Sequence, residues 1–250
     1  MLPLRHSGVP RCCDIGMGEE LCFSLTIVVL VRPAPECMSH SSKFGSAGRG
    51  FTPRNSVDHR ADPDVLRASL AQSRIIPSVR AAENIAAACA SPSKIVFLLF
   101  GTPLIVGDLV AQLRDAGKLP IVNMDLLAGF ARDSAAIEFL ARTGIGGIIS
   151  THQDTLRAAR SQGLFVFQRT FALDSVAVSN SVRNLEHFVP DVIELLPAIA
   201  APLVLPILRA VRPQLPVIGC GLVRSLSQIN DLVQQGVVSI SVSDSSLWII

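Results

Sequence analysis

The sequence lacks the charge excess and the long apolar segments that mark several large classes of protein. Its formal net charge is only +2 over 250 residues, whereas nucleic-acid-binding proteins usually carry a clear basic excess. Any RNA contact must therefore come from a local patch. The apolar run at residues 21–31 is shorter than the ~20 residues that a transmembrane helix needs, and it follows Glu19 and Glu20 rather than a basic segment. We expect neither a membrane span nor a signal peptide.

Cysteine is present without the spacing that metal sites or disulfide frameworks show. Four of the six cysteines occur in the first forty residues, and no histidine pair accompanies them at zinc-ligand spacing. A disulfide framework is typical of small secreted chains. We therefore expect reduced thiols, a cytoplasmic protein, no metal and no cofactor.

Residues 1–70 also lack sustained periodicity and mix Pro, Gly, Ser and Arg. This composition predicts a disordered extension, or a start site assigned too early, before a folded domain at residues 71–250. In that domain, strand-like apolar runs alternate with amphipathic helix-like segments, as in repeated βα units. The expected strands are 74–80, 94–101, 119–127, 144–151, 164–171, 191–198, 215–223 and 237–243.

Eight such strands predict a small (β/α)8 TIM-like barrel. An open doubly wound sheet is the alternative, but that fold usually carries a glycine fingerprint in its first βα turn. None follows Arg80, so we favour the barrel. Asp133 or Ser134, and also Ser225, are suited to begin helices.

Functional side chains of such barrels gather at the carboxyl ends of the strands. Arg80, Asp125, Arg169 and Glu194 are charged residues at or near the ends of apolar runs. A charge in such a place must be paired or bound to a ligand. Two interpretations stay open for Arg169: it forms a buried ion pair with a carboxylate, or it binds a ligand.

Small residues end the last two strands, at Gly219, Gly221 and Ser243. Loops at this place commonly bind phosphate, because small residues let backbone N–H groups approach an anion. No lysine ends a strand after Lys94, so a Schiff-base aldolase would lack its nucleophile. A lyase or isomerase of a small phosphorylated metabolite, with Asp125 and Glu194 as acid and base, remains an alternative. Cys220 is a further candidate nucleophile.

Several runs occur in one order along the chain, including Ile-Ile-Pro-Ser-Val-Arg at 75–80, Asn-Met-Asp-Leu-Leu-Ala-Gly at 123–129, Gln-Arg-Thr-Phe-Ala-Leu-Asp at 168–174 and Asp-Val-Ile-Glu-Leu-Leu-Pro at 191–197. Together they resemble the glycerol-3-phosphate responsive antiterminator family over residues 74–248. The resemblance implies a barrel that senses glycerol 3-phosphate and acts on leader mRNA of a glycerol-catabolic operon. It implies a regulator more than an enzyme, and a homo-oligomer is compatible with it.

On this resemblance, Arg80, Asp125, Arg169 and Glu194 line the ligand pocket. The chain departs from the family pattern at five positions, which are Asn123, Ala128, His152, Ala198 and Cys220. Arg157, Arg160 and Arg183 are the candidate contacts for RNA phosphates. A ligand-binding subunit that acts through a protein partner is the third hypothesis.

Overall fold

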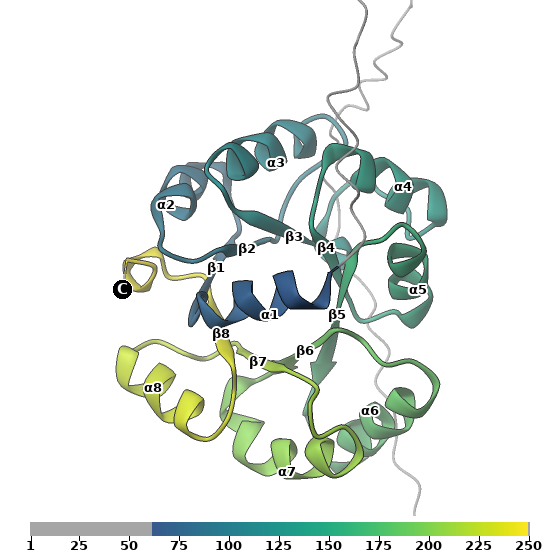
Figure 1. Ribbon diagram of the computed structural model, residues 1–250, viewed down its shortest axis with the longest axis vertical. Coiled ribbons are helices and arrows are strands. Elements are labelled where there is room, and N and C mark those ends of the chain that lie inside the picture. The colour runs from purple at the N-terminus through teal and green to yellow at the C-terminus, as the bar shows by residue number, and fades with distance from the viewer. Residues whose placement is uncertain (1–61, 250) are drawn as a thin grey trace, which may run out of the picture. The chain divides into compact units, whose positions relative to one another are not determined.

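Eight parallel strands pair in chain order, and the last pairs with the first, in a computed structural model that describes residues 62–249 (Figure 1). The strands are β1 (Ile75–Val79), β2 (Ile95–Leu98), β3 (Leu119–Asn123), β4 (Gly147–Ser150), β5 (Phe165–Phe171), β6 (Val192–Leu196), β7 (Val217–Cys220) and β8 (Ser239–Val242). The predicted barrel is confirmed. Because β1 pairs with both β2 and β8, the open doubly wound sheet is excluded.

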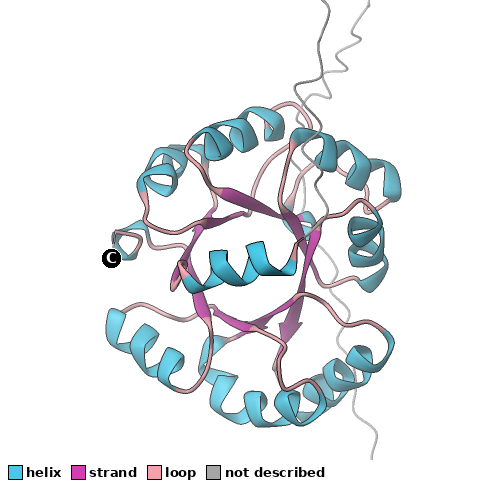
Figure 2. Ribbon diagram, in the orientation of Figure 1, coloured by secondary structure: helices cyan, strands magenta, loops and turns pink. Residues whose placement is uncertain are grey.

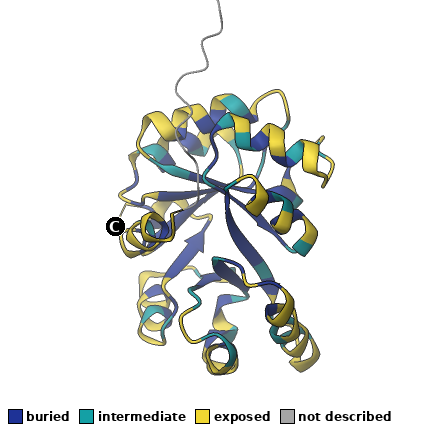
Figure 3. Ribbon diagram, turned by 45° about the vertical axis from the view of Figure 1, so that its right-hand side comes forward, coloured by how far each residue is buried: buried dark blue, intermediate teal, exposed yellow. Residues whose placement is uncertain are grey.

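The strands are buried on both faces because side chains fill the barrel and helices cover it. Inward-facing residues form one apolar cluster, in which the rings of Phe97 and Phe167 meet edge to face at 5.6 Å. Outward-facing residues such as Val96 and Val166 pack against the helices in a second cluster. The strands are dark blue in Figure 3 and the outer faces of the helices are largely yellow. The barrel is therefore a packed core and no open channel.

A ring of helices surrounds the strands (Figure 2). The helices after α1 are α2 (Ile85–Ala90), α3 (Val106–Asp115), α4 (Ser134–Thr143), α5 (Gln153–Ser161), α6 (Ser175–His187), α7 (Ala201–Val211) and α8 (Leu226–Gln234). Asp133 and Ser225 cap α4 and α8 as expected, each accepting a hydrogen bond from a backbone N–H in the first turn. Short 3₁₀ turns occur at Ala82–Asn84, Met124–Leu126, Ala198–Ala200 and Ser245–Leu247.

Helix α1 (Pro63–Ala71) lies across the amino-terminal opening of the barrel (Figure 1). Its buried Leu66 and Leu70 join the cluster inside the barrel, so this helix closes that end. We expected a disordered extension over residues 1–70. Residues 63–70 instead belong to this helix. Asp62 caps the helix, and Pro63 stands at its first turn, where proline is favoured. Residues 1–61, with the apolar run and four of the cysteines, lie outside the described residues.

No helix within residues 62–249 combines the length and the apolar character needed to cross a membrane.

Candidate functional site

Asp125 lies just past the end of β3 and ties that strand end to β4. Its carboxylate accepts hydrogen bonds from Ser150 Oγ at 2.8 Å, from the Thr151 backbone N at 2.7 Å and from Thr151 Oγ1 at 2.9 Å. Arg132 Nε lies 3.5 Å from the same carboxylate, and the Asp125 side chain is only 13% exposed. Asp125 is therefore at the barrel mouth as predicted, but both of its oxygens already have partners.

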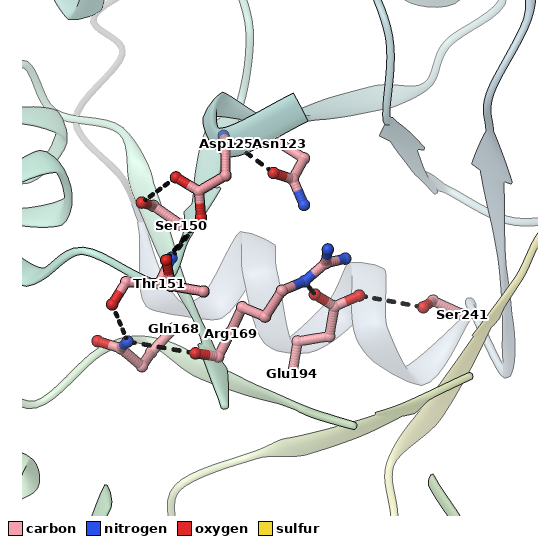
Figure 4. A network of polar contacts seen from close by, with 8 residues as sticks. All are labelled: Asn123, Asp125, Ser150, Thr151, Gln168, Arg169, Glu194 and Ser241. Atoms are coloured by element: carbon pink, nitrogen blue, oxygen red, sulfur yellow. Dashed lines mark hydrogen bonds and ion pairs between the residues drawn. The ribbon is translucent and has the colours of Figure 1, made fainter. Parts of the chain in front are cut away.

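Arg169 and Glu194 form a buried ion pair at the centre of the mouth (Figure 4). They stand opposite each other on β5 and β6, and Arg169 Nε donates to Glu194 Oε2 at 2.7 Å. Ser241 Oγ donates to the other carboxylate oxygen at 3.2 Å. The side chains are 9% and 0% exposed, which confirms the ion-pair interpretation. A direct role in ligand binding stays a prediction for both residues.

Electrostatics keep Arg169 charged despite its burial. Burial alone would lower the pKa of Arg169, but the hydrogen bond and the charge of Glu194 outweigh it and raise the pKa above its ordinary value. The pair is thus a fixed, internally neutral group in the floor of the mouth.

A pocket of about 260 Å³ opens between the loops that follow β7 and β8. Two arginines, Arg80 and Arg224, line it together with three serines, Ser78, Ser241 and Ser243. Asp244 lines it as well, and its carboxylate accepts hydrogen bonds from Ser246 N at 3.0 Å and Ser246 Oγ at 2.7 Å. Arg80 Nε donates to Ser243 Oγ at 2.9 Å, which holds the guanidinium beside the loop after β8. Two guanidinium groups around a small pocket with several hydroxyls suit an anion with oxygen acceptors.

Backbone geometry shapes this pocket. Gly221 and Leu222 are both in the left-handed region, with φ of +80° and +62°. Glycine adopts this region at little cost, whereas leucine rarely does. The Leu222 side chain is 69% exposed. The turn that contains these two residues continues from the end of β7 to Arg224, and all of it lines the pocket.

Gly219 does not line this pocket, although Cys220 and Gly221 after it do. A Cβ atom there would lie 2.9 Å from Ile240 Cδ1 and 3.0 Å from Ala198 Cβ. The absent side chain thus makes room for close packing of β7 against its neighbours. A role for Gly219 in ligand binding stays untested, while Arg80, Gly221 and Ser243 are brought together as predicted.

Arg224, Ser78 and Ser241 line the pocket but were not among the site residues predicted from the sequence. Arg224 directly precedes the helix cap Ser225, and a basic residue between a glycine turn and a helix start was the available signal. Ser78 and Ser241 are polar residues inside otherwise buried strands, which is the same signal that identified Glu194. Among the described residues, Ser78 Oγ and Asn123 Nδ2 are buried without a hydrogen-bond partner. Such atoms normally bind water or a ligand.

Asn123 is oriented by one hydrogen bond at the end of β3. Its Oδ1 accepts from the Asp125 backbone N at 3.1 Å, so the side-chain nitrogen is the free end. In Figure 4 that nitrogen points toward the side of the mouth where the Arg169 guanidinium lies. An acceptor such as a water or a ligand oxygen is therefore expected beside Asn123.

Cys220 ends β7 but is unsuited to be a nucleophile. Burial raises the pKa of its thiol, and the nearby Glu194 carboxylate adds to this, to a value of about 12. The thiolate, which is the reactive form, is thus scarce at neutral pH.

We expect Cys220 to resist alkylation. At pH 8 iodoacetamide should modify it roughly a thousandfold more slowly than an exposed thiol, because the thiolate fraction falls tenfold for each rise of one in pKa. Peptide mapping by mass spectrometry after timed labelling measures the rate for this cysteine alone. Labelling in 6 M urea supplies the exposed reference, and equal rates in the two conditions would contradict the prediction.

Arg157 and Arg160, two of the predicted RNA contacts, fasten α5 to the end of α6. Their guanidinium groups donate to the backbone oxygens of His187 at 3.1 Å and Val189 at 2.8 Å. Both also lie over the Phe188 ring, at 4.9 and 4.5 Å from its centroid. These contacts give the two arginines a packing role. RNA contact by Arg157, Arg160 or Arg183 remains a prediction.

Within residues 62–249, no cluster of three or more His, Cys, Asp or Glu side chains is arranged to hold a metal ion.

Comparisons with known proteins agree with this geometry. The family model of the glycerol-3-phosphate responsive antiterminators matches residues 75–248. An uncharacterized Escherichia coli protein, YgcP, is 29% identical over 180 residues, covering 72% of this chain and 93% of its own length. The structure of a glycerol uptake operon antiterminator-related protein from Thermotoga maritima matches with a TM-score of 0.64 and 31% identity, covering 70% of this chain and 98% of that one.

A glycerol uptake operon antiterminator regulatory protein from Listeria monocytogenes is similar as well, with a TM-score of 0.66 and 29% identity over 71% of this chain and 95% of that chain. Barrel enzymes share the fold alone, for example orotidine 5'-phosphate decarboxylase from Pyrococcus horikoshii, with 16% identity, a TM-score of 0.51, and coverage of 67% of this chain and 88% of that one. On the extent of the family match, this chain belongs to the glycerol-3-phosphate responsive antiterminator family.

Proposed function

We propose that the protein binds glycerol 3-phosphate and, in response, acts on leader mRNA so that transcription passes a terminator in a glycerol-catabolic operon. The observation that carries the ligand half of this proposal is the pocket between the loops after β7 and β8, with Arg80 and Arg224 in its wall. The RNA half follows from the family. A regulator of nascent mRNA acts in the cytoplasm.

The two ends of glycerol 3-phosphate suit different parts of the mouth. Arg80, Arg224 and Ser243 offer positive charge and donors for the phosphate. Ser78, with an unpartnered buried hydroxyl, and Ser241 offer hydrogen bonds for the glycerol hydroxyls. Asp125 and Glu194 already accept several hydrogen bonds, so their role is to hold the mouth in shape around the ligand.

Enzymatic turnover of a phosphorylated metabolite is the weaker hypothesis. It needs Asp125 and Glu194 as proton-transfer groups, yet Asp125 bridges β3 to β4 and Glu194 is paired with Arg169. The barrel enzymes that resemble this chain share its fold without close sequence similarity.

A thermal-shift series tests the ligand. Glycerol 3-phosphate should raise the melting temperature, because a ligand that binds only the folded state stabilises it. Glycerol and inorganic phosphate at equal concentration should each raise it less, since each fills only part of the site. If glycerol 3-phosphate and inorganic phosphate raised the melting temperature equally, the pocket would bind phosphate without recognising the glycerol part, and glycerol 3-phosphate would not be its specific ligand.

A gel-shift assay with leader RNA tests the response. We expect a complex at low salt whose affinity changes when glycerol 3-phosphate is added. An RNA complex that is indifferent to the ligand, or no complex at low salt, would overturn the RNA half of the proposal. Salt dependence should be recorded, because phosphate contacts dominate RNA affinity.

A further inference from the structure

Helix α7 is apolar on the face that it turns to solvent as well as on the face that it buries. It buries Ala201, Val204, Leu205 and Leu208 and exposes Pro202, Leu203, Pro206 and Ile207. No charged residue occurs in this helix before Arg209. The outer faces of α5 and α8 are instead polar and charged. A helix that is hydrophobic all round is normally covered on all sides.

A groove of about 410 Å³ runs beside this helix, between α6 and α7. Leu173, Leu203 and Ile207 stand at its edge and are 77%, 77% and 47% exposed, and Ile199, one turn before Leu203, is 72% exposed. We call these four residues the α6–α7 face. The only charged residue that lines the groove is Asp174, and its carboxylate caps α6 by accepting from the Ala177 N at 2.7 Å. Exposed apolar surface of this kind marks an interaction site.

We propose that the α6–α7 face is the interface of a homodimer, in which α7 packs against α7 of a second copy across a two-fold axis. A two-fold interface requires one surface that is complementary to itself. This face has a ridge, Leu203 and Ile207 four residues apart, directly beside a groove of matching apolar character. Ridges of residues spaced by four pack into the grooves of an identical helix in the commonest class of helix contact.

Charge argues for a second copy over other occupants. RNA and anionic lipid are held by basic side chains, and helices that lie on membranes carry Lys or Arg along their polar face. The two arginines near the end of α7 are engaged elsewhere, since Arg209 donates to the Gly236 backbone oxygen and Arg212 to that of Leu185. An uncharged, apolar face is best buried against another uncharged, apolar surface. The α6–α7 face of a second copy of this chain is such a surface.

The dimer does not depend on glycerol 3-phosphate or RNA. Stable interfaces bury ~800 Å² on each partner, so the contact would extend beyond the four named residues to their neighbours, including the rest of the loop between β5 and α6 in which Leu173 lies. No residue that lines the pocket beside β7 and β8 belongs to the α6–α7 face or lines its groove, so the proposed contact uses a different part of the surface from the ligand pocket.

Light scattering on the full-length protein after size-exclusion chromatography tests this interface. The wild type should elute with twice the mass of one chain. Leu203→Glu should raise the dissociation constant of the dimer more than ~30-fold, because it places a charge at the centre of a desolvated contact. The variant should then elute as a monomer at micromolar concentration. Circular dichroism should be unchanged, since Leu203 packs little against its own chain.

Leu104→Glu is the matched control. Leu104 is 90% exposed and precedes α3, and α3 lies across the barrel from α6 and α7 (Figure 1). This variant should remain a dimer. A monomeric wild type overturns the proposal, as does a Leu203→Glu protein that stays dimeric. Co-sedimentation of the wild-type monomer with neutral lipid vesicles would assign the face to a membrane and would also overturn it.

Discussion

Glu194→Ala is expected to lower the free energy of unfolding by about 3–5 kcal/mol, which is the usual loss when one partner of a buried ion pair is removed. The Arg169 side chain is only 9% exposed and Glu194 is fully buried, so the variant would leave a guanidinium charge in the barrel mouth without its counter-ion. Ser241 would also lose an acceptor. Urea unfolding followed by circular dichroism measures the change.

Two further variants separate the buried pair from ordinary salt bridges. Glu138→Ala removes a partner of Arg142 on the surface of α4, where both side chains are largely exposed. It should change stability by at most about 0.5 kcal/mol. The double variant Arg169→Met with Glu194→Leu should recover most of the lost stability, because apolar residues of similar volume replace a buried pair well. A Glu194→Ala protein within 1 kcal/mol of wild type would contradict the role given to the pair.

Arg80→Ala is expected to weaken binding of glycerol 3-phosphate at least ~30-fold, which corresponds to the ~2 kcal/mol typical of losing a charge-assisted contact. Arg80 is exposed, and its one hydrogen bond to a side chain joins it to Ser243 at 2.9 Å. Removing it should therefore leave the fold intact while taking one of two positive charges from the pocket. Isothermal titration calorimetry gives the affinity directly.

Arg74→Ala is the control for this change. Arg74 precedes β1 and Arg80 follows it, so the two arginines lie at opposite ends of the same strand, and Arg74 bonds Asn230 at 2.5 Å. Its loss should leave the affinity unchanged. Equal effects from the two variants would mean that overall charge, and not this pocket, determines binding.

The architecture follows from the sequence because each strand lies within a largely apolar run, and because α1, α4, α6 and α8 each begin at a capping side chain. The eight expected runs contain the eight strands, and Asp133 and Ser225 begin helices as their chemistry predicts. Helix α1 could not be inferred in the same way. Its two buried leucines, Leu66 and Leu70, pack inside the amino-terminal end of the barrel. They indicate a helix only when the barrel and its open end are already known.

The site was predictable in its residue types and less so in its pairings. Charged residues near strand ends identified Arg80, Asp125, Arg169 and Glu194. Which of them touch depends on the register of β5 against β6 and on the loop after β7, where Leu222 adopts a left-handed conformation. Neither the register of these strands nor the conformation of this loop can be inferred from the residues next to it in the sequence. Arg224 follows that turn and lines the pocket, and Gly219 is explained by packing that involves residues distant in the sequence.

Within residues 62–249, helix α1 closes the amino-terminal end of the barrel and side chains fill its interior, so a molecule bound among the strand ends leaves through the mouth. A partner that covered the mouth without touching the ligand would therefore slow its arrival and its departure by the same factor. The equilibrium occupancy would stay as it was, while the lifetime of the bound state would lengthen. In such an arrangement, the duration of a signal is adjusted separately from the concentration that triggers it.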